Sequence, residues 1–277
     1  AQSFRTKKAD KGKRKGIMLH KIKMTKPKIA VIWFPGANCE NETKISCEAA
    51  GMDAEILRWN TKENLDNYDG FIIPGGWSYE DRIRAGVISS KDPLMLKIKD
   101  EAKQGKPVLG ICNGCQVLVE SGLIPGLKDK VEMALAPNIN PFISGFYCTW
   151  VKIKNSTKNK NAFNEFYDKD EIIDIPIAHA EGRFTTKDKN LIKELEDNGQ
   201  IIFKYCDEDG KTSQKFPVNP NGSMENIAGI TNKEGNVLAM MPHPERGFFK
   251  KQLKEKDMNN FEDAMSLTSA AKIFESM

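Results

Sequence analysis

The sequence predicts an α/β fold, namely a doubly wound, mostly parallel sheet flanked by helices, with added antiparallel strands. In the first half of the chain, short apolar runs rich in β-branched residues alternate with helical patterns, as they do in βαβ units. The second half contains more strand patterns than helices. A glycine-rich or polar motif follows most of the apolar runs, and ligands bind beyond the carboxyl ends of the strands in open α/β sheets.

The first half begins with the apolar run IAVIWF at residues 29–34, which is typical of a strand buried on both faces. A helix over residues 42–50 follows and ends at Gly51, because glycine is common just past the last turn of a helix. The other predicted elements of this half are strands at 54–59, 70–73 and 107–111 and a helix at 92–103. Right-handed crossovers would place helices on both faces of the sheet.

The second half mixes strands with polar insertions. Two strands are predicted at residues 146–154 and 172–178, and antiparallel pairing between them is one possibility. The polar stretch KNSTKNKNAFNEFYDKDE between them is interpreted as a surface insertion. The remaining predictions are strands at 201–205 and 237–241, a charged insertion at 250–260 and a C-terminal helix at 261–274.

The composition is that of an ordinary globular protein. Of the 277 residues, 39% are hydrophobic and 29% are charged, and no apolar run approaches the roughly 18 to 20 residues that a membrane span needs. A membrane role is therefore not expected. Residues 1–23 contain no long apolar segment of the secretory type, which favours a cytoplasmic location.

The net charge of +4 comes from one end of the chain. Residues 1–23 hold nine of the 42 Lys and Arg residues and one acidic residue, so the remainder carries 33 basic and 37 acidic residues. We expect residues 1–23 to be a disordered basic extension and residues 24–277 to be a single domain. Because that domain is slightly acidic, no nucleic-acid binding is expected.

The stretch GICNGCQ, residues 110–116, follows the predicted strand at 107–111 and holds two of the six cysteines. It fits the G-x-C-x-G pattern of a nucleophile elbow, in which small neighbours allow a tight strand-to-helix turn. Cys112 would lie at the N-terminus of a helix that runs through 116–120, where backbone N–H groups and the helix dipole favour a thiolate. Cys112 is therefore the candidate nucleophile, and Cys115 is expected to pack in the core.

Two other interpretations of Cys112 and Cys115 stay open at this point. A C-x-x-C pair at a strand–helix junction also occurs in thioredoxin-like redox proteins, although those folds are small and need no downstream His and Glu. A zinc site would need a second pair of ligands, and the sequence has no other C-x-x-C and no H-x-x-x-H. In the absence of a secretory segment, reduced thiols are expected.

A cysteine nucleophile needs a base and a group that orients the base. Two histidines follow apolar runs, and each precedes a glutamate by two positions: His179 with Glu181, and His243 with Glu245. Spacing alone does not separate these pairs. Pro244 restricts the backbone beside His243 and gives both flanking side chains a defined geometry, which favours His243 and Glu245.

The motifs PGG, GICNGCQ and PHPER, in this order, resemble those of the class I glutamine amidotransferases, whose fold is doubly wound and flavodoxin-like. Four finer motifs are similar to those of the glutaminase subunits of phosphoribosylformylglycinamidine synthase, an enzyme of purine biosynthesis. They are FPGANCENET, PGGWSYEDRIRAG, AHAEGRF and NPNGSMENIAGI. The similarity covers nearly all of residues 27–276.

This resemblance implies a catalytic triad in which Cys112 is the nucleophile, His243 the base and Glu245 the group that orients it. It also implies a glutamine site in which two backbone N–H groups form the oxyanion hole. The residues of that site are Gly76 and Asn113, which form the hole, with Trp77 and Gln116 beside the substrate.

The chain departs from the pattern of that family in three places. Trp77 stands where Phe is usual, and Glu80 stands where Gly is usual. The stretch PNINPFISGFYCTWV has extra residues and lacks two arginines that the family shows there. The departures concern contacts of those arginines and leave the implied triad intact.

By the same resemblance, the chain is expected to hydrolyse L-glutamine and to supply ammonia to a large synthetase subunit, with a small third subunit in the complex. That synthetase would convert formylglycinamide ribonucleotide to formylglycinamidine ribonucleotide. The resemblance also implies that ATP and Mg²⁺ bind to the synthetase and that this chain holds no cofactor or metal. The lack of a G-x-x-x-x-G-K-[ST] loop in the sequence is consistent with that division.

Three alternatives remain at this point. They are an amidotransferase subunit that serves a different acceptor, a cysteine hydrolase of the same architecture without glutamine specificity, and a module that binds a partner without catalysis. The motifs AHAEGRF and NPNGSMENI are interpreted either as part of the partner interface or ammonia exit, or as a hydrogen-bonded structural turn.

Overall fold

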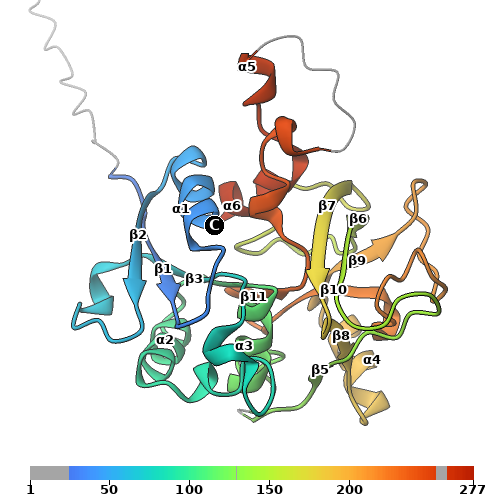
Figure 1. Cartoon of the computed structure of the whole chain (residues 1–277), viewed down its shortest axis with the longest axis horizontal. Helices are drawn as coiled ribbons and strands as arrows, with labels where there is room; N and C mark the ends of the chain where they lie inside the picture. Colours follow the sequence, from blue (N-terminus) through green and yellow to red (C-terminus); the bar gives the residue numbers. More distant parts are fainter. Residues whose placement is uncertain (1–24, 129, 254–260) are drawn as a thin grey trace, which may run out of the picture.

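The computed structural model describes residues 25–128, 130–253 and 261–277. Its main feature is a sheet of nine strands in the order β2-β1-β3-β4-β11-β10-β9-β6-β7 (Figure 1). The strands β5 and β8 pair in a separate small sheet. The basic extension predicted at residues 1–23 lies outside the described residues, and so does most of the charged insertion predicted at 250–260.

The elements have the following bounds. The strands are β1 (Lys28–Trp33), β2 (Asp53–Arg58), β3 (Gly70–Ile73), β4 (Val108–Ile111), β5 (Ala134–Ala136), β6 (Tyr147–Asn155), β7 (Ile172–His179), β8 (Arg183–Thr185), β9 (Ile201–Cys206), β10 (Ile227–Thr231) and β11 (Val237–Met240). The α-helices are α1 (Glu40–Ala49), α2 (Pro93–Lys103), α3 (Asn113–Ser121), α4 (Lys189–Asp197), α5 (Phe261–Ala264) and α6 (Lys272–Ser276).

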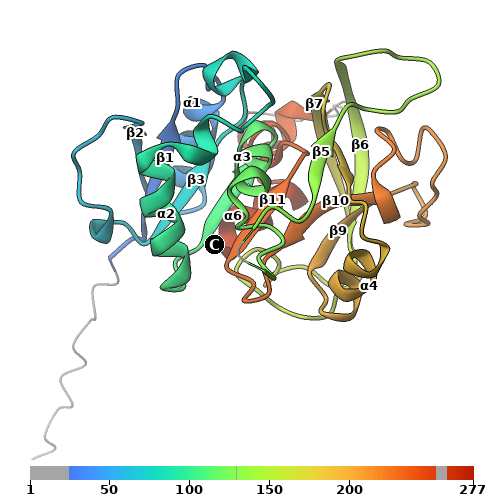
Figure 2. The same cartoon turned by 90° about the horizontal axis from the view of Figure 1, so that it is seen from below.

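The predicted fold class is confirmed. The strands β2, β1, β3, β4 and β11 are parallel, and their order is the 2-1-3-4-5 order of a flavodoxin-like sheet. The strands β10, β9, β6 and β7 extend it with antiparallel pairs. Helices α1 and α6 lie on one side of the sheet, and α2 and α3 lie on the other side, which Figure 2 shows from below.

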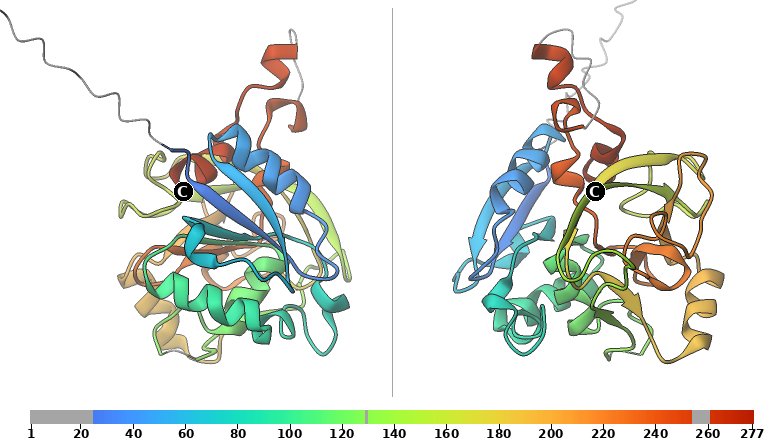
Figure 3. Two further views of the ribbon diagram at one scale, coloured as in Figure 1. Left: turned by 90° about the vertical axis from the view of Figure 1, so that its left-hand side faces the viewer. Right: turned by 45° about the vertical axis from the view of Figure 1, so that its right-hand side comes forward.

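The carboxyl ends of several strands lie at the same edge of the sheet. The parallel strands β1, β3, β4 and β11 all end there. From β11 the direction reverses four times, through β10, β9, β6 and β7, so β7 also ends at this edge. The sheet twists strongly along its length (Figure 3), and β7 returns to the segment after β11, where His243 N–H donates to Pro176 O at 2.9 Å.

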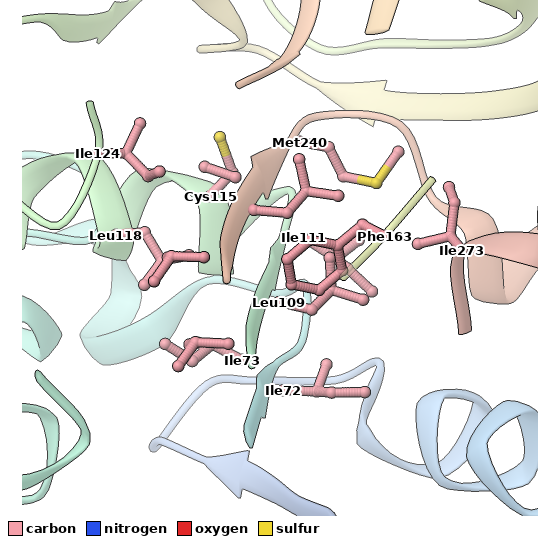
Figure 4. Packing of buried hydrophobic residues seen from close by; sticks show 14 of the residues in the cluster. Ile72, Ile73, Leu109, Ile111, Cys115, Leu118, Ile124, Phe163, Met240 and Ile273 are labelled. Atoms are coloured by element: carbon pink, nitrogen blue, oxygen red, sulfur yellow. The ribbon is translucent and has the colours of Figure 1, made fainter. Parts of the chain in front are cut away.

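The core fills both sides of β4. Leu109 and Ile111 project to one side, toward Phe163 and Ile273, because successive side chains of a strand alternate (Figure 4). On the other side Gly110 lets α3 approach closely, since a Cβ there would lie 2.5 Å from Leu118 Cδ1. In the part of the chain that the structure describes, no helix has both the length and the apolar character of a membrane span.

The predicted C-terminal helix at 261–274 is wrong. The structure has two short helices, α5 and α6, and residues 266–268 between them run beside residues 248–250. Lys250 N–H donates to Ser266 O at 2.9 Å, and Thr268 N–H donates to Phe248 O at 3.0 Å. These tertiary hydrogen bonds replace the helical ones at the Ser and Thr residues, which are weak helix formers.

One further prediction needs correction. The polar stretch after β6 is not only a surface insertion, because Phe163 and Tyr167 within it are buried and Tyr167 Oη donates to Ser269 O at 2.5 Å. The helix α3 begins at Asn113, so Cys112 lies at its N-terminus as predicted. The pattern analysis missed the helix α4. It also missed β10 and the short pair β5 and β8, since strands of three to five residues carry little periodicity.

The close contact of α3 with β3 can be tested at Gly114. A Cβ on Gly114 would overlap Ile73 O, so Gly114→Ala is expected to lower the free energy of unfolding by about 3 kcal/mol or more through overpacking. The control is Gly51→Ala. Its Cβ would meet nothing within 4 Å, and its φ of +94° predicts a cost of about 1 to 2 kcal/mol. Urea unfolding of both variants measures the difference, and equal losses would contradict this account.

Candidate active site

Cys112 lies between β4 and α3 in a strained conformation. Its φ of 52° and ψ of −105° fall in a region that residues with a side chain rarely adopt. The two flanking glycines make this turn possible: a Cβ on Gly110 would lie 2.6 Å from the Gly114 carbonyl oxygen, and a Cβ on Gly114 would overlap β3. The segment therefore has the geometry of a nucleophile elbow.

The two cysteines of the elbow lie in different environments. Cys112 lines a cavity, whereas Cys115 is completely buried in the hydrophobic core (Figure 4). Burial raises the pKa of the Cys115 thiol well above its ordinary value. None of the cysteines in the described residues forms a disulfide. The arrangement favours a single reactive thiol over a redox dithiol.

His243 and Glu245 form a buried acid–base pair at the end of β11. The Nδ1 atom of His243 lies 2.6 Å from Glu245 Oε1, and both residues are at most 2% exposed. The short 3-10 turn Pro244–Arg246 fixes this geometry. Burial by itself would lower the pKa of His243, but the charges of Glu245 and Cys112 outweigh it and hold that pKa well above its usual range.

The imidazole of His243 faces the Cys112 elbow across Gly75. A Cβ on Gly75 would lie 2.8 Å from Cε1 of His243 and 3.5 Å from Cβ of Cys112, so only glycine leaves the space between them open. The Nε2 atom of His243 is buried and has no hydrogen-bond partner in the described residues. It is therefore free to exchange a proton with a thiol or a substrate.

The predicted site residues come together around one cavity of about 240 Å³. Five of the seven predicted residues line it: Gly76, Trp77, Cys112, Gln116 and His243. The other two stand behind its wall, where Glu245 supports His243 and the Asn113 side chain holds the adjoining loop. This volume lies just below the common range of ligand pockets, about 300 to 1,000 Å³, and suits a small ligand.

Two backbone N–H groups have no acceptor among the described residues: that of Gly76, which lines the cavity, and that of Asn113, the residue after Cys112. Asn113 is the first residue of α3, so no carbonyl of the helix can accept from its N–H. Gly76 has φ +144°, and a Cβ there would lie 2.6 Å from Ala37 Cα, so this turn requires glycine. Its own N–H makes no bond within the turn. Two such donors suit a developing oxyanion.

The Asn113 side chain ties the elbow to the loop after β3. Its Oδ1 accepts from Ser78 N–H at 3.0 Å, and its Nδ2 donates to Asp81 and to Gln116 at 3.1 and 2.9 Å. Gln116 in turn donates to Glu181 O at 2.8 Å. The amide of Gln116 is thus engaged on both sides, so this residue positions the cavity wall as well as lining it.

Trp77 stands at the mouth of the cavity. It is 47% exposed, and its ring stacks on Phe146 with 5.9 Å between ring centroids. Ile83, which also lines the mouth, is 91% exposed. The mouth therefore presents apolar surface around the entrance.

His179 is not a second acid–base pair with Glu181. Its Nδ1 contacts Asn138 Oδ1 at 3.2 Å, and the ring is buried. Burial, and then the charge of His243, lower the pKa of His179 to about 3. Of the two candidate histidines, only His243 thus has a carboxylate partner.

The motifs AHAEGRF and NPNGSMENI are joined by hydrogen bonds. Asn221 Nδ2 donates to Gly182 O at 2.8 Å, and Phe184 N–H donates to Ser223 Oγ at 3.1 Å. The second motif therefore holds the loop after β7 against the cavity. This geometry agrees with the hydrogen-bonded turn that was one of the two interpretations.

Sequence reasoning missed several residues of the cavity. Among these are Cys39, Asp81 and Arg246, whereas Glu181 was considered only as the partner of His179. Arg246 donates to Cys39 Sγ at 3.1 Å, and burial raises the pKa of the Cys39 thiol. Burial and then the charge of Glu181 raise the pKa of Asp81 to about 6. Each of these residues lies on a segment that follows the end of a strand. Their position beyond the carboxyl ends of the strands could therefore have identified them as candidates.

The donor atoms of Cys39, His243 and Glu245 lie within 4.8 Å of one another, a spacing that metal sites also show. Here His243 and Glu245 already bind each other. The grouping is therefore explained by the acid–base pair and its neighbouring thiol.

A model of the CobB/CobQ-like glutamine amidotransferase domain matches residues 26–277. The phosphoribosylformylglycinamidine synthase subunit PurQ of Methanothrix thermoacetophila is 50% identical over 236 residues, which cover 83% of this chain and 90% of that protein. The subunit of the same name from Aquifex aeolicus is 45% identical over 220 residues, which cover 79% of this chain and 90% of that protein. The solved structure of PurLQS from Thermotoga maritima has 30% identity and a TM-score of 0.68, and covers 91% of this chain and 97% of its own.

Both halves of the chain thus contribute residues to one cavity. The sequence comparison and the structural comparison both match this chain to PurQ-containing synthases. The chain belongs to the CobB/CobQ-like glutamine amidotransferase family, in the branch formed by the PurQ subunits of phosphoribosylformylglycinamidine synthase.

Proposed function

We propose that this chain is a glutaminase that hydrolyses L-glutamine to glutamate and ammonia through a Cys112 thioester. The ammonia passes to a synthetase partner that converts formylglycinamide ribonucleotide to formylglycinamidine ribonucleotide. The observation that carries the proposal is the meeting of the strained Cys112 elbow and the His243–Glu245 pair in one cavity. The names of the relatives support the acceptor.

The first half of the reaction releases ammonia. Cys112 gives its proton to Nε2 of His243, and the sulfur bonds to the carboxamide carbon of glutamine. The carbonyl oxygen takes up the electron pair, and the N–H groups of Gly76 and Asn113 stabilise it. His243 then donates the proton to the nitrogen, the C–N bond breaks, and ammonia leaves a γ-glutamyl thioester.

The second half uses the same groups in reverse. His243 removes a proton from a water molecule whose oxygen bonds to the thioester carbon. The C–S bond then breaks, glutamate leaves, and the sulfur regains its proton from His243. Glu245 stabilises the imidazolium in both halves and keeps Nδ1 protonated, so that Nε2 always faces the reacting atoms.

The partner is proposed to be a large synthetase subunit, with a small third subunit in the same complex. ATP and Mg²⁺ would act on the synthetase. The solved PurLQS structure supports such an assembly. A protected route between the two sites is needed because free ammonia is protonated in water and is then no nucleophile.

The first test compares the two elbow cysteines by the same substitution. Cys112→Ala is expected to lower glutamine turnover by about 10⁴-fold or more, because the nucleophile is lost. A glutamine-like electrophile is expected to alkylate Cys112 in the unsubstituted chain, which peptide mass spectrometry reads out.

Cys115→Ala is the control, because it removes a buried thiol of the same segment without touching the cavity. It is expected to keep turnover within about threefold while costing some stability. An equal loss in both variants would revive the dithiol interpretation, and alkylation at another cysteine would overturn the assignment of Cys112.

The second test concerns the partner. Glutamine turnover is expected to rise about 5- to 100-fold when the synthetase, ATP and formylglycinamide ribonucleotide are added, as for coupled sites in general. Glutamate formation with and without each component measures this. Full activity of the chain alone would contradict a subunit role, and activation by a synthetase for another acceptor would favour the alternative amidotransferase.

A further inference from the structure

The buried ring of His179 has a tautomer that its surroundings determine. Asn138 Nδ2 donates to His179 O at 2.8 Å, which identifies the other amide atom, Oδ1, as the acceptor. That Oδ1 also accepts from Gly182 N–H at 3.0 Å. Since Oδ1 can only accept, the Nδ1 atom of His179, 3.2 Å away, carries the proton. Nε2 is then a bare acceptor.

This acceptor has no partner, although it is buried. His179 is 3% exposed and lines the cavity, and its Nε2 has no hydrogen bond within the described residues. Buried polar atoms are nearly always paired in native proteins, so an orphan acceptor at a ligand cavity calls for a donor from the ligand. The ring packs directly on Gly182, where a Cβ would lie 2.6 Å from Nε2, so this position requires glycine.

The site therefore offers both donors and acceptors. The donors are the N–H groups of Gly76, which lines the cavity, and of Asn113, the residue after Cys112. The acceptors are His179 Nε2 and Ala178 O, which lies 3.6 Å from Cys112 Sγ. A primary carboxamide has the matching arrangement, with one oxygen that accepts and an NH₂ group that donates.

We propose that His179 Nε2 accepts a hydrogen bond from the carboxamide NH₂ of the substrate and then from the departing ammonia, which makes His179 a selector of amides over esters. The proposal rests on the proposed glutaminase function. No proton moves to His179. His243 supplies the proton that completes ammonia, the C–N bond breaks, and the product leaves as neutral NH₃.

The low pKa of His179, about 3, supports this role. An imidazole that stays neutral can hold ammonia without protonating it, so the ammonia remains a nucleophile for the synthetase. A protonated imidazole would instead present an N–H to the substrate NH₂ and repel it.

The experiment compares two substrates in two variants of the full chain bound to its synthetase. The substrates are L-glutamine and L-glutamate γ-methyl ester, whose leaving group has no N–H to donate. His179→Gln places an amide oxygen near the position of Nε2, whereas His179→Asn reaches only the position of Nδ1. The asparagine amide can still bond to Asn138, which contacts the position of Nδ1.

His179→Asn is expected to lose about 10- to 100-fold in kcat/KM for glutamine, the usual effect of leaving a buried group unpaired, with ester turnover within threefold of the unsubstituted chain. His179→Gln is expected to retain glutamine turnover within about threefold. An equal loss for both substrates in His179→Asn, or an unchanged glutamine rate, would overturn the proposal. If the unsubstituted chain hydrolyses neither substrate, the proposed function itself fails, and this inference with it.

A second variant tests the tautomer without altering His179. Asn138→Asp sets a carboxylate beside Nδ1 and favours the imidazolium, in which Nε2 carries a proton. The ratio of glutamine to ester turnover is then expected to rise with pH from 6 to 9, as the ring loses that proton, and to stay constant in the unsubstituted chain. A ratio independent of pH in Asn138→Asp would contradict the proposal.

Groups that affect the turnover of both substrates equally do not change the ratio of glutamine to ester turnover when they titrate. The other titratable or charged groups that line the cavity are Cys39, Asp81, Arg84, Cys112, Glu181, His243 and Arg246. Among them, the charge of His243 acts on the pKa of His179, and His243 serves amide and ester hydrolysis alike.

Discussion

The hydrogen bond from His243 N–H to Pro176 O closes the site, and the cavity depends on it. Five strand-to-strand steps separate β4 from β7 in the sheet, which would be about 24 Å in a flat sheet. Yet Cys112, just past β4, lies 3.6 Å from Ala178 O in β7. The right-handed twist of successive strands brings the two together, and the bond at Pro176 holds them there.

This closure gives the cavity two walls of different chemistry. The wall from the parallel half consists of tight turns whose glycines expose backbone N–H groups, and the wall from β7 exposes a carbonyl and an imidazole nitrogen. A flavodoxin-like sheet alone could make only the first of these walls. The four added antiparallel strands are therefore part of the site, not a decoration of the fold.

Patterns within short stretches made much of the architecture predictable. The apolar runs marked the parallel strands, the glycine frame marked Cys112, and Pro244 separated His243 from His179. The predictions that failed concern features that depend on contacts between residues far apart in the sequence. The C-terminal helix breaks because residues 266–268 bond to residues 248–250, and the tautomer of His179 depends on Asn138, 41 positions away. Cys39 and Asp81 lie on loops whose course no periodicity encodes.

The position of β11 also determines when the chain acquires its chemistry. This strand lies between β4 and β10 in the middle of the sheet, yet of the strands in the described residues it is the last to be synthesised. On the ribosome, the parallel half must wait with an open edge at β4 until residues 237–240 emerge and insert there. His243 follows three residues later. The nascent chain therefore carries an elbow thiol without its base while residues 113–242 are synthesised, and the reactive centre is assembled only once β11 has joined the sheet.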